Sequence, residues 1–288
     1  MILTTICFES EYFNVKDTLE CGQVFRFRKF KDGYLVLSND KACYSYTLGD
    51  KTYIECDEKD KDYFYNYFDL GRDYSKIVES AQNQGVEILS LSSKLGKGIR
   101  ILKQGVTETL FSFIISQNNN IPRIKNSIEK ICQNLGEKKE FMGEVYFCFP
   151  TSQKLAEKQL EFYKEMGLGY RAVYVKRLAQ ELVDGSLDLS SINDLPTKML
   201  KNALTGIYGV GPKVADCVSL FGFNRTDSFP VDTWIAKVYE QDFGGKLKDR
   251  KKMAEWFSLK FGDNAGYFQQ YLFYYKRSLE SHSSRNDK

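Results

Sequence analysis

The first 57 residues alternate between hydrophobic and polar positions, with turn signals between the alternating runs. VFRFRKF is followed by Asp32-Gly33 and YLVL, and CYSYT is followed by Gly49-Asp50 and TYIEC. Strict alternation indicates half-buried strands, and such glycine–aspartate pairs are typical of tight hairpin turns. The pattern therefore predicts an antiparallel meander over residues 1–57.

From about residue 58 onward, hydrophobic residues recur every three or four positions, which is the spacing of one helix face. One series of isoleucines ends at Leu135-Gly136 and a later stripe ends at Gly185, each glycine standing where a C-cap belongs. Another helix is expected from Thr151, directly after Pro150. Further helices are predicted over 196–206, 212–223, 232–241, 250–261 and 264–280.

These patterns together predict an α+β fold. A small antiparallel β-rich N-terminal domain, residues 1–100, is followed by an all-helical domain, residues 101–280. The polar residues 281–288 are expected to form a disordered tail. The sequence shows no internal repeat and no low-complexity tract.

Composition argues against several kinds of site. The seven cysteines are scattered and never spaced as CxxC, so we expect no disulfide framework, zinc site or iron–sulfur cluster. The single histidine, His282, lies in the polar tail, which argues against histidine-based catalysis. The net charge of +3 permits nucleic-acid binding without requiring it, because recognition depends on a local patch.

The N-terminus does not resemble a signal peptide. It has no basic region and reaches Glu9 early, and no apolar run in the chain is long enough to span a bilayer. Unpaired cysteines fit a reducing compartment. We therefore expect an intracellular protein, in the cytoplasm or nucleoid, that is monomeric and does not bind membranes.

A glycine turn separates two helical patterns in the segment LTGIYGVGPKVADC. Amide groups near Gly209, Gly211 and Val214 would stand free there, and such groups suit a phosphate. A P-loop is excluded, because Pro212 interrupts the contiguous GK[ST] of that motif. Two interpretations stay open: a helix–hairpin–helix that binds a DNA phosphate and, through its carbonyls, a monovalent cation, or a plain helix–helix turn.

Lys213 and Asp232 add chemistry to this turn. Lys213 opens the second helix, where the positive end of the helix dipole disfavours a protonated amine. An unprotonated lysine can attack an electrophilic carbon such as a sugar C1′. Cys217 lies one turn further along the same face. Asp232 fits an N-cap, which fixes a carboxylate and is compatible with catalysis; the alternatives are a solvated lysine and a purely capping aspartate.

Amides, rings and arginines appear together in three other places. Asn118 and Arg123 flank a polar loop that can hydrogen-bond to base edges, although its three asparagines also fit a capping loop. Gln269 and Phe273 share one face of the last helix and suit a base held by edge hydrogen bonds and stacking. Partial core burial explains that pair equally simply. Tyr170-Arg171 at a helix start is either a DNA wedge or a surface cap.

Taken together, these segments resemble one family. The matching segments are CGQVFRF, YFDLGRDY, GIRILKQ, LFSFIISQNNNIPRI, GLGYRA, GVGPKVADC, FPVD and GYFQQYLF. The chain resembles the eukaryotic-type 8-oxoguanine DNA glycosylase/AP lyases of the helix–hairpin–helix (HhH-GPD) superfamily. The combination of GVGxKVADC with PVD is the most specific part, and the resemblance runs through much of the chain.

The resemblance implies the chemistry at matching positions. Lys213 is expected to be the nucleophile and Schiff-base former, and Asp232 to stabilise charge at C1′. The family flips the damaged base into a pocket. The expected pocket residues are Gly22, Gln269, Phe273 and Cys217. The Gly22 carbonyl would accept a hydrogen bond from N7–H, which 8-oxoguanine has and guanine lacks.

The resemblance also implies how DNA is held. Asn118, Arg123 and Arg171 are expected to hold the unpaired cytosine, with Tyr170 as the wedge. Amides of Gly209, Gly211 and Val214 would bind phosphate, and carbonyls of Thr205, Ile207 and Val210 would hold a structural monovalent or calcium ion. No cofactor is required. The expected partner is double-stranded DNA that contains 8-oxoguanine, excised preferably opposite cytosine.

Two positions depart from the family pattern. Tyr208 stands where the hairpin usually has proline, and Trp234 stands where the eukaryotic enzymes carry a histidine. The four-cysteine iron–sulfur loop of the endonuclease III and adenine-glycosylase branches is absent. Two alternative functions stay open: a monofunctional alkyl-base glycosylase, against which Lys213 argues, and a non-catalytic DNA-binding module that uses the hairpin alone.

Overall fold

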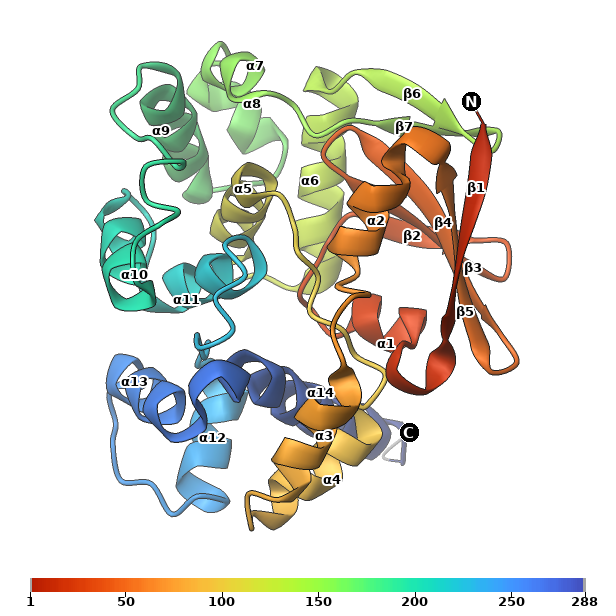
Figure 1. The fold of residues 1–288 in the computed structure, drawn as a ribbon. Helices are drawn as coiled ribbons and strands as arrows, with labels where there is room; N and C mark the ends of the chain where they lie inside the picture. The colour runs from red at the N-terminus through yellow and green to blue at the C-terminus, as the bar shows by residue number, and fades with distance from the viewer. Residues whose placement is uncertain (1, 287–288) are drawn as a thin grey trace.

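An antiparallel five-stranded sheet, in the order β1-β5-β4-β3-β2, forms the N-terminal part of the computed structural model, which describes residues 2–286 (Figure 1). The strands are β1 (Leu3–Glu9), β2 (Phe27–Phe30), β3 (Gly33–Ser38), β4 (Lys41–Leu48) and β5 (Lys51–Asp57). Three two-residue turns connect the consecutive strands from β2 through β5. The first residue of each turn has a positive φ: Lys31, Asn39 and Gly49. The predicted meander is thus confirmed for β2–β5.

One helix interrupts the strands predicted for residues 1–57. α1 (Val15–Glu20) follows the short 3₁₀ turn η1 (Ser10–Tyr12), and β1 pairs with β5 at the far edge of the sheet. The Asn14 side chain caps α1 by accepting from the Asp17 N–H at 3.0 Å, and Leu19 is buried beneath the sheet. Six residues give too few turns for a helical period to be recognised in the sequence.

The rest of the chain is mainly helical, as predicted. In chain order the elements are η2 (Glu58–Asp60), α2 (Lys61–Tyr67), α3 (Tyr74–Gln82), α4 (Glu87–Leu95), α5 (Val106–Ser116), α6 (Ile121–Leu135), α7 (Ser152–Ala156), α8 (Leu160–Glu165), α9 (Arg171–Val183), α10 (Thr197–Gly206), α11 (Pro212–Phe221), α12 (Thr233–Gln241), α13 (Arg250–Phe261), η3 (Gly262–Asn264) and α14 (Ala265–Asn286). The middle of the apolar helix α5 is fully buried. It runs between the sheet side and α9–α11 (Figure 1).

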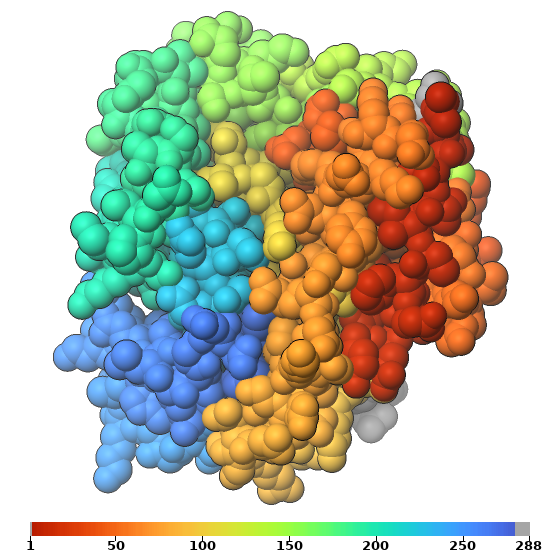
Figure 2. All heavy atoms as spheres, in the orientation of Figure 1, coloured from red at the N-terminus to blue at the C-terminus, as the bar shows by residue number. Residues whose placement is uncertain are grey.

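Buried polar contacts join the sheet to the helices. Arg26, just before β2, forms an ion pair with Glu108 of α5, with Nη1 and Oε2 3.1 Å apart. Arg100 is completely buried, and its guanidinium donates to four backbone carbonyls. These belong to Tyr12, Phe68, Asp69 and Arg72. In Figure 2 the residues of α2–α4 form a continuous band between the N-terminal strands and the later helices, and α4 packs on α14.

Two segments differ from the predicted helical part. A hairpin, β6 (Lys138–Phe141) and β7 (Glu144–Phe147), packs Tyr146 on Leu35 and Tyr44 of the sheet. Its charged sequence carries no clear apolar alternation, so it was not predicted. Also, α14 continues as helix to Asn286, which includes most of the tail predicted to be disordered. That segment has no glycine or proline to end the helix; residues 287–288 lie outside the described part.

The predicted boundary between two domains at residue 100 stays a prediction. Within residues 2–286, no helix combines the length and apolar character needed to cross a membrane.

Candidate active site

Side chains from several parts of the fold meet around one pocket, here called the central pocket. Its lining consists of Cys21, Gly22, Phe113, Lys213, Cys217, Phe221, Pro230, Asp232, Gln269, Gln270 and Phe273. These residues come from the end of α1, from α5 and α11, from the segment before α12, and from α14. All six residues that the sequence assigns to catalysis or to the lesion base therefore lie together, although they span 252 positions from the first, Gly22, to the last, Phe273, counted inclusively.

Gly22 enters the pocket in a conformation that requires glycine. Its φ is +89°, and a Cβ atom there would lie 3.3 Å from Cε1 of Phe273. The neighbouring Gln23 fixes this segment, because its Nε2 donates to the carbonyls of Thr18 and Arg100, both at 2.8 Å. Gly22 thus approaches the ring of Phe273 closely and is held there by buried hydrogen bonds.

Lys213 stands above an aromatic wall. α11 begins with Pro212, and the Nζ of Lys213 lies 5.5 Å from the centroid of the Phe113 ring. Phe113 stacks on Phe221 with centroids 5.5 Å apart and ring planes at 15°. Neither phenylalanine was predicted to be a site residue, although Phe113 lies within the LFSF segment of the resemblance. Their rings make the surroundings of the amine apolar on one side.

Asp232 is the N-cap of α12, as its position in the sequence predicts. Its Oδ1 accepts from the backbone N–H groups of Trp234 at 3.0 Å and Ile235 at 2.9 Å. Burial raises the pKa of Asp232, while the two backbone hydrogen bonds and the charge of Lys213 oppose that rise. The carboxylate is therefore fixed in position and electrostatically linked to the lysine.

Cys217 and Gln269 form other parts of the pocket wall. Burial raises the pKa of the Cys217 thiol to about 11, so this group is a neutral thiol at physiological pH. Gln269 is 4% exposed, and its Oε1 accepts from Nε2 of Gln270 at 2.8 Å. Gln270 was not predicted to be a site residue, because the prediction used only Gln269 and Phe273, which lie four residues apart and so share one helix face. This hydrogen bond leaves the Gln269 amide N–H groups available in the pocket.

A second cluster lies where the loop after α5 meets the start of α9. Arg171 is buried, and its Nε, Nη1 and Nη2 donate to the carbonyls of Gln117, Leu168 and Asn118 at 2.6, 3.2 and 2.7 Å. The Arg171 guanidinium lies 4.5 Å from the ring centroid of Tyr170, which is 51% exposed. Arg171 therefore supports the Asn118 loop and keeps two of its five N–H groups unused by these bonds.

The amide of Gln117 connects this cluster to the glycine hairpin. Its Nε2 donates to the Gly209 carbonyl at 2.9 Å. Asn118 has a φ of +45°, an uncommon backbone conformation for a residue with a side chain. Arg123 is exposed in the first turn of α6, where Asn120 caps its N–H. The structure thus brings Asn118, Tyr170 and Arg171 together and leaves Arg123 on the adjacent surface.

The turn between α10 and α11 is a helix–hairpin–helix. Gly209 has a φ of +86°, and a Cβ atom there would lie 2.4 Å from Cγ of Tyr174. Among residues 2–286, no protein acceptor is bonded to the N–H of Gly209 or Gly211, and Gly211 leaves the N-terminus of α11 without a side-chain cap. These amides and that of Val214 in the first turn of α11 are available to an anion.

The two departures from the family pattern lie in different elements, Tyr208 in the hairpin and Trp234 at the start of α12. The Tyr208 and Tyr174 rings pack edge to face with centroids 5.3 Å apart, and the Arg177 guanidinium lies 4.5 Å from the centroid of the Tyr208 ring. Trp234 is partly exposed directly after the Asp232 cap, with the Lys237 amine 4.8 Å from its ring centroid. Within residues 2–286, no cluster of three or more His, Cys, Asp or Glu side chains could hold a metal ion.

Comparison with known families covers most of the chain. Residues 5–110 match the family model described as 8-oxoguanine DNA glycosylase, N-terminal domain. Residues 111–261 match that of the HhH-GPD superfamily base excision DNA repair protein.

Relatives and solved structures agree with these matches. A probable N-glycosylase/DNA lyase of Methanothermobacter thermautotrophicus is 30% identical over 73% of this chain and 72% of its own length. The N-glycosylase/DNA lyase of Saccharomyces cerevisiae is 38% identical over 51% of this chain, a match that spans only 42% of the yeast protein. The structure of a Clostridium acetobutylicum 8-oxoguanine glycosylase/lyase, solved with double-stranded DNA containing cytosine opposite 8-oxoguanine, is 37% identical with a TM-score of 0.89. It covers 94% of this chain and 93% of that chain. The chain therefore belongs to the 8-oxoguanine DNA glycosylase family of the HhH-GPD superfamily.

Proposed function

We propose that this chain is a bifunctional DNA repair enzyme that excises 8-oxoguanine and then cleaves the abasic strand. The observation that carries the proposal is the central pocket, where a lysine, a capped carboxylate, a glycine, an amide and an aromatic ring converge from distant parts of the chain. Membership of the family and the names of its relatives support the same activity.

In the proposed reaction, the Lys213 amine forms a bond to C1′ as the bond from C1′ to the base nitrogen breaks. The bonding electrons leave with the base, and Asp232 stabilises the positive charge that develops at the sugar. The C1′–O4′ bond then breaks, which opens the sugar ring, and O4′ takes up a proton to become a hydroxyl. The product at C1′ is an iminium, the Schiff base. Removal of a C2′ proton then expels the 3′-phosphate by β-elimination, and water releases the lysine.

Recognition of the lesion depends on one proton. The Gly22 carbonyl would accept from N7–H of 8-oxoguanine but would face the N7 lone pair of guanine, which leaves a buried acceptor unpaired. Gln269 would bond the Watson–Crick edge, with Phe273 and Cys217 on the two faces of the base. The close approach of Gly22 to the Phe273 ring supports this placement.

We also propose how the rest of the DNA is held. Asn118, Arg123 and Arg171 would contact the cytosine opposite the lesion, and the exposed Tyr170 ring would fill the gap in the duplex. The free amides of the hairpin would bind a backbone phosphate. Because all three Arg171 nitrogens already donate to backbone carbonyls, two of them in the Asn118 loop, its contribution to cytosine would come from the two remaining N–H groups.

The hairpin ion, the monomeric state and the intracellular location stay predictions from the sequence. The carbonyls of Thr205, Ile207 and Val210 would hold the ion, and Ile207 already accepts from the Val210 N–H at 3.0 Å, which leaves it one lone pair. No step of the proposed reaction depends on this ion.

Excision assays test the proposal against its alternatives. Duplexes with 8-oxoguanine opposite each of the four bases are incubated with the protein, and base release and strand cleavage are measured separately. We expect both products, fastest opposite cytosine. Release without cleavage would indicate a monofunctional glycosylase, and binding without release a DNA-binding module. Equal rates on all four duplexes would remove the cytosine-reading role of Asn118, Arg123 and Arg171.

A further inference from the structure

A run of positive charge spans the end of the α12–α13 connection and the first turn of α13. Residues 246–252, here called the basic segment, contain one carboxylate, Asp249, and five cations: Lys246, Lys248, Arg250, Lys251 and Lys252. All five cations are exposed, and within residues 2–286 only Lys248 among them forms an ion pair, with Glu240 at 3.1 Å. Because the net charge of the whole chain is only +3, the basic segment is a local patch of the kind that nucleic-acid recognition requires.

The start of α13 is an unfavourable place for three of these cations. Arg250, Lys251 and Lys252 are its first three residues, and no acidic residue stands in that turn. The positive end of the helix dipole lies there, so each cation destabilises the helix. Asp249 is the N-cap and accepts from the backbone N–H of Lys251 at 2.8 Å, but it supplies only one negative charge. Stability therefore does not explain the three cations, and a local rule broken in this way is expected at a functional surface.

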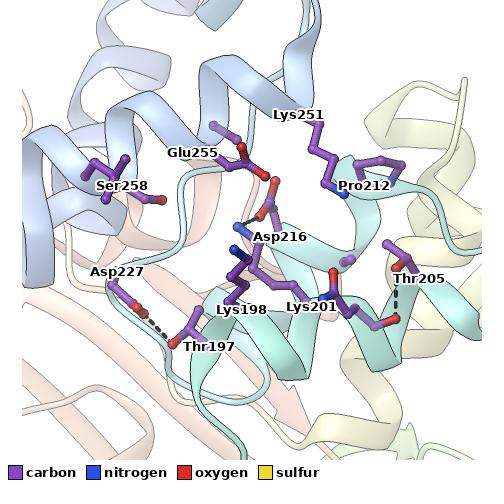
Figure 3. Close-up of a pocket in the computed structure, with 14 residues that line it drawn as sticks. Thr197, Lys198, Lys201, Thr205, Pro212, Asp216, Asp227, Lys251, Glu255 and Ser258 are labelled. Atoms are coloured by element: carbon purple, nitrogen blue, oxygen red, sulfur yellow. Dashed lines mark hydrogen bonds and ion pairs between the residues drawn. The ribbon is translucent and has the colours of Figure 1, made fainter.

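A cavity connects the first turn of α13 with the hairpin. Its volume is about 530 Å³, and it is enclosed by α10, α11 and α13 (Figure 3). Lys251 lines it together with Thr205 near the end of α10 and Pro212 at the start of α11, and Figure 3 shows the Lys251 side chain extending toward Pro212. Lys201 of the same cavity is engaged by Asp216, with Nζ and Oδ1 2.5 Å apart. Lys251 thus remains as an unpaired cation beside the turn whose amides are available to an anion.

Arg250 extends the basic segment toward the central pocket. Burial raises the pKa of Asp232, and the positive charge of Arg250 is among the influences that oppose this rise. The field of an exposed guanidinium acts only over a short distance, because water and salt screen it. The first turn of α13 therefore lies close both to Asp232 and to the hairpin.

The hairpin separates the basic segment from the proposed wedge. α10 and α11 lie between α9, which begins directly after Tyr170, and α13 (Figure 1). A duplex that meets the Tyr170 ring and the free amides of Gly209 and Gly211 would therefore extend toward the basic segment. Successive phosphates of one strand follow each other every ~3.4 Å along the duplex axis, so several of them would pass this surface.

We propose that the basic segment is a second contact for the DNA backbone, in which Arg250 and Lys251 each bind a phosphate near the one held by the hairpin amides. The inference rests on the proposed function, because it takes double-stranded DNA as the partner. Contacts of this kind fix the position of the duplex without reading its sequence. They also account for cations, rather than carboxylates, in the first turn of α13.

The test is the salt dependence of binding to a duplex without a lesion, so that excision is not required. Each phosphate that a cation neutralises adds about 0.9 to the slope of log affinity against log salt concentration. Arg250→Gln combined with Lys251→Gln should therefore lower that slope by about 1.8. Between roughly 50 and 200 mM salt, the affinity of the wild type should fall about tenfold more than that of the variant.

Lys76→Gln combined with Lys260→Gln is the matched control, because it removes two exposed lysines away from the hairpin. Lys76 lies on α3, and Lys260 lies in the last turn of α13, about 14 Å along the helix axis from Lys251. This variant should keep the wild-type slope. The thermal midpoint provides a second readout: removing cations from the start of α13 should leave it unchanged or raise it, whereas loss of a structural contact would lower it.

The possible outcomes separate this inference from the proposed function. A wild-type slope in the Arg250→Gln, Lys251→Gln variant, or an equal fall in the control, would overturn the inference even if excision is normal. Should the double variant not fold, Lys251→Gln alone decides, with an expected fall of about 0.9. A wild type that binds the duplex with the expected slope, but that borohydride does not trap as a reduced Schiff base on DNA with a preformed abasic site, would contradict only the proposed function.

Discussion

Replacing Gly22 by alanine tests the geometry of the central pocket most sharply. At a φ of +89°, an L-residue costs about 1–2 kcal/mol more than glycine. The added methyl group would also lie 3.3 Å from Cε1 of Phe273, so the ring must shift by a few tenths of an ångström. Both effects change the wall on which the proposed base recognition depends.

Two measurements separate the two effects. Backbone strain of about 1–2 kcal/mol should lower the thermal midpoint by roughly 2–8 °C. Displacement of the ring and carbonyl should reduce excision of 8-oxoguanine by about 10–100-fold, because small misplacements at a reacting centre cost this much. Trapping on preformed abasic DNA should fall less, since that substrate has no base to hold.

Gly185→Ala is the matched control. Gly185 has a φ of +79° and no atom within 4 Å of its added Cβ, so it carries the strain without the contact. We expect a similar loss of thermal stability with unchanged excision. If Gly22→Ala excised 8-oxoguanine at the wild-type rate, the placement of the base beside Gly22 and Phe273 would be refuted.

Three other substitutions have distinct expected results. Asp232→Asn should leave the free energy of unfolding nearly unchanged, because asparagine caps helices as well as aspartate does, yet abolish most excision; equal losses of both would show a purely capping role. Arg100→Met should lower the free energy of unfolding in urea by about 3 kcal/mol or more, since it leaves four backbone carbonyls, two of them buried, without donors; a loss below 1 kcal/mol would show that they find other partners. The raised pKa of Asp216, about 6, means that its neutral form stabilises the fold at low pH and that this contribution is lost as pH rises through 6. Between pH 4.5 and pH 7.5 this loss is about 2 kcal/mol, and urea titrations at these two pH values should show that Asp216→Asn lacks it; the same pH dependence in both proteins would contradict it.

The sequence predicted the strands and helix starts that depend on neighbouring residues in the chain. The alternating runs with their glycine–aspartate turns became β2–β5, and the Asp232 cap begins α12 as its sequence position indicates. By contrast, α1 was too short for its period to be recognised, and β6–β7 forms because Tyr146 packs on the outer face of the sheet. That contact depends on tertiary structure, so no spacing within the hairpin reveals it.

The sequence patterns predict individual residues of the central pocket better than they predict how those residues come together. Nothing in the spacing of Gly22 and Phe273 indicates that they touch, and the resemblance to a family supplied that expectation. Phe113, Phe221 and Gln270 were missed because buried aromatic and amide residues on a helix are more often core than site. Their contribution becomes visible only once α5, α11 and α14 are packed together.

The proposed function requires that Lys213 form the covalent bond to DNA. Its most direct test is to trap the protein with borohydride on duplex DNA containing 8-oxoguanine, digest the complex, and locate the modified residue by mass spectrometry. We expect a single adduct on Lys213, which is lost in Lys213→Gln while that variant still binds the duplex. An adduct on another residue, or trapping that persists in Lys213→Gln, would contradict it.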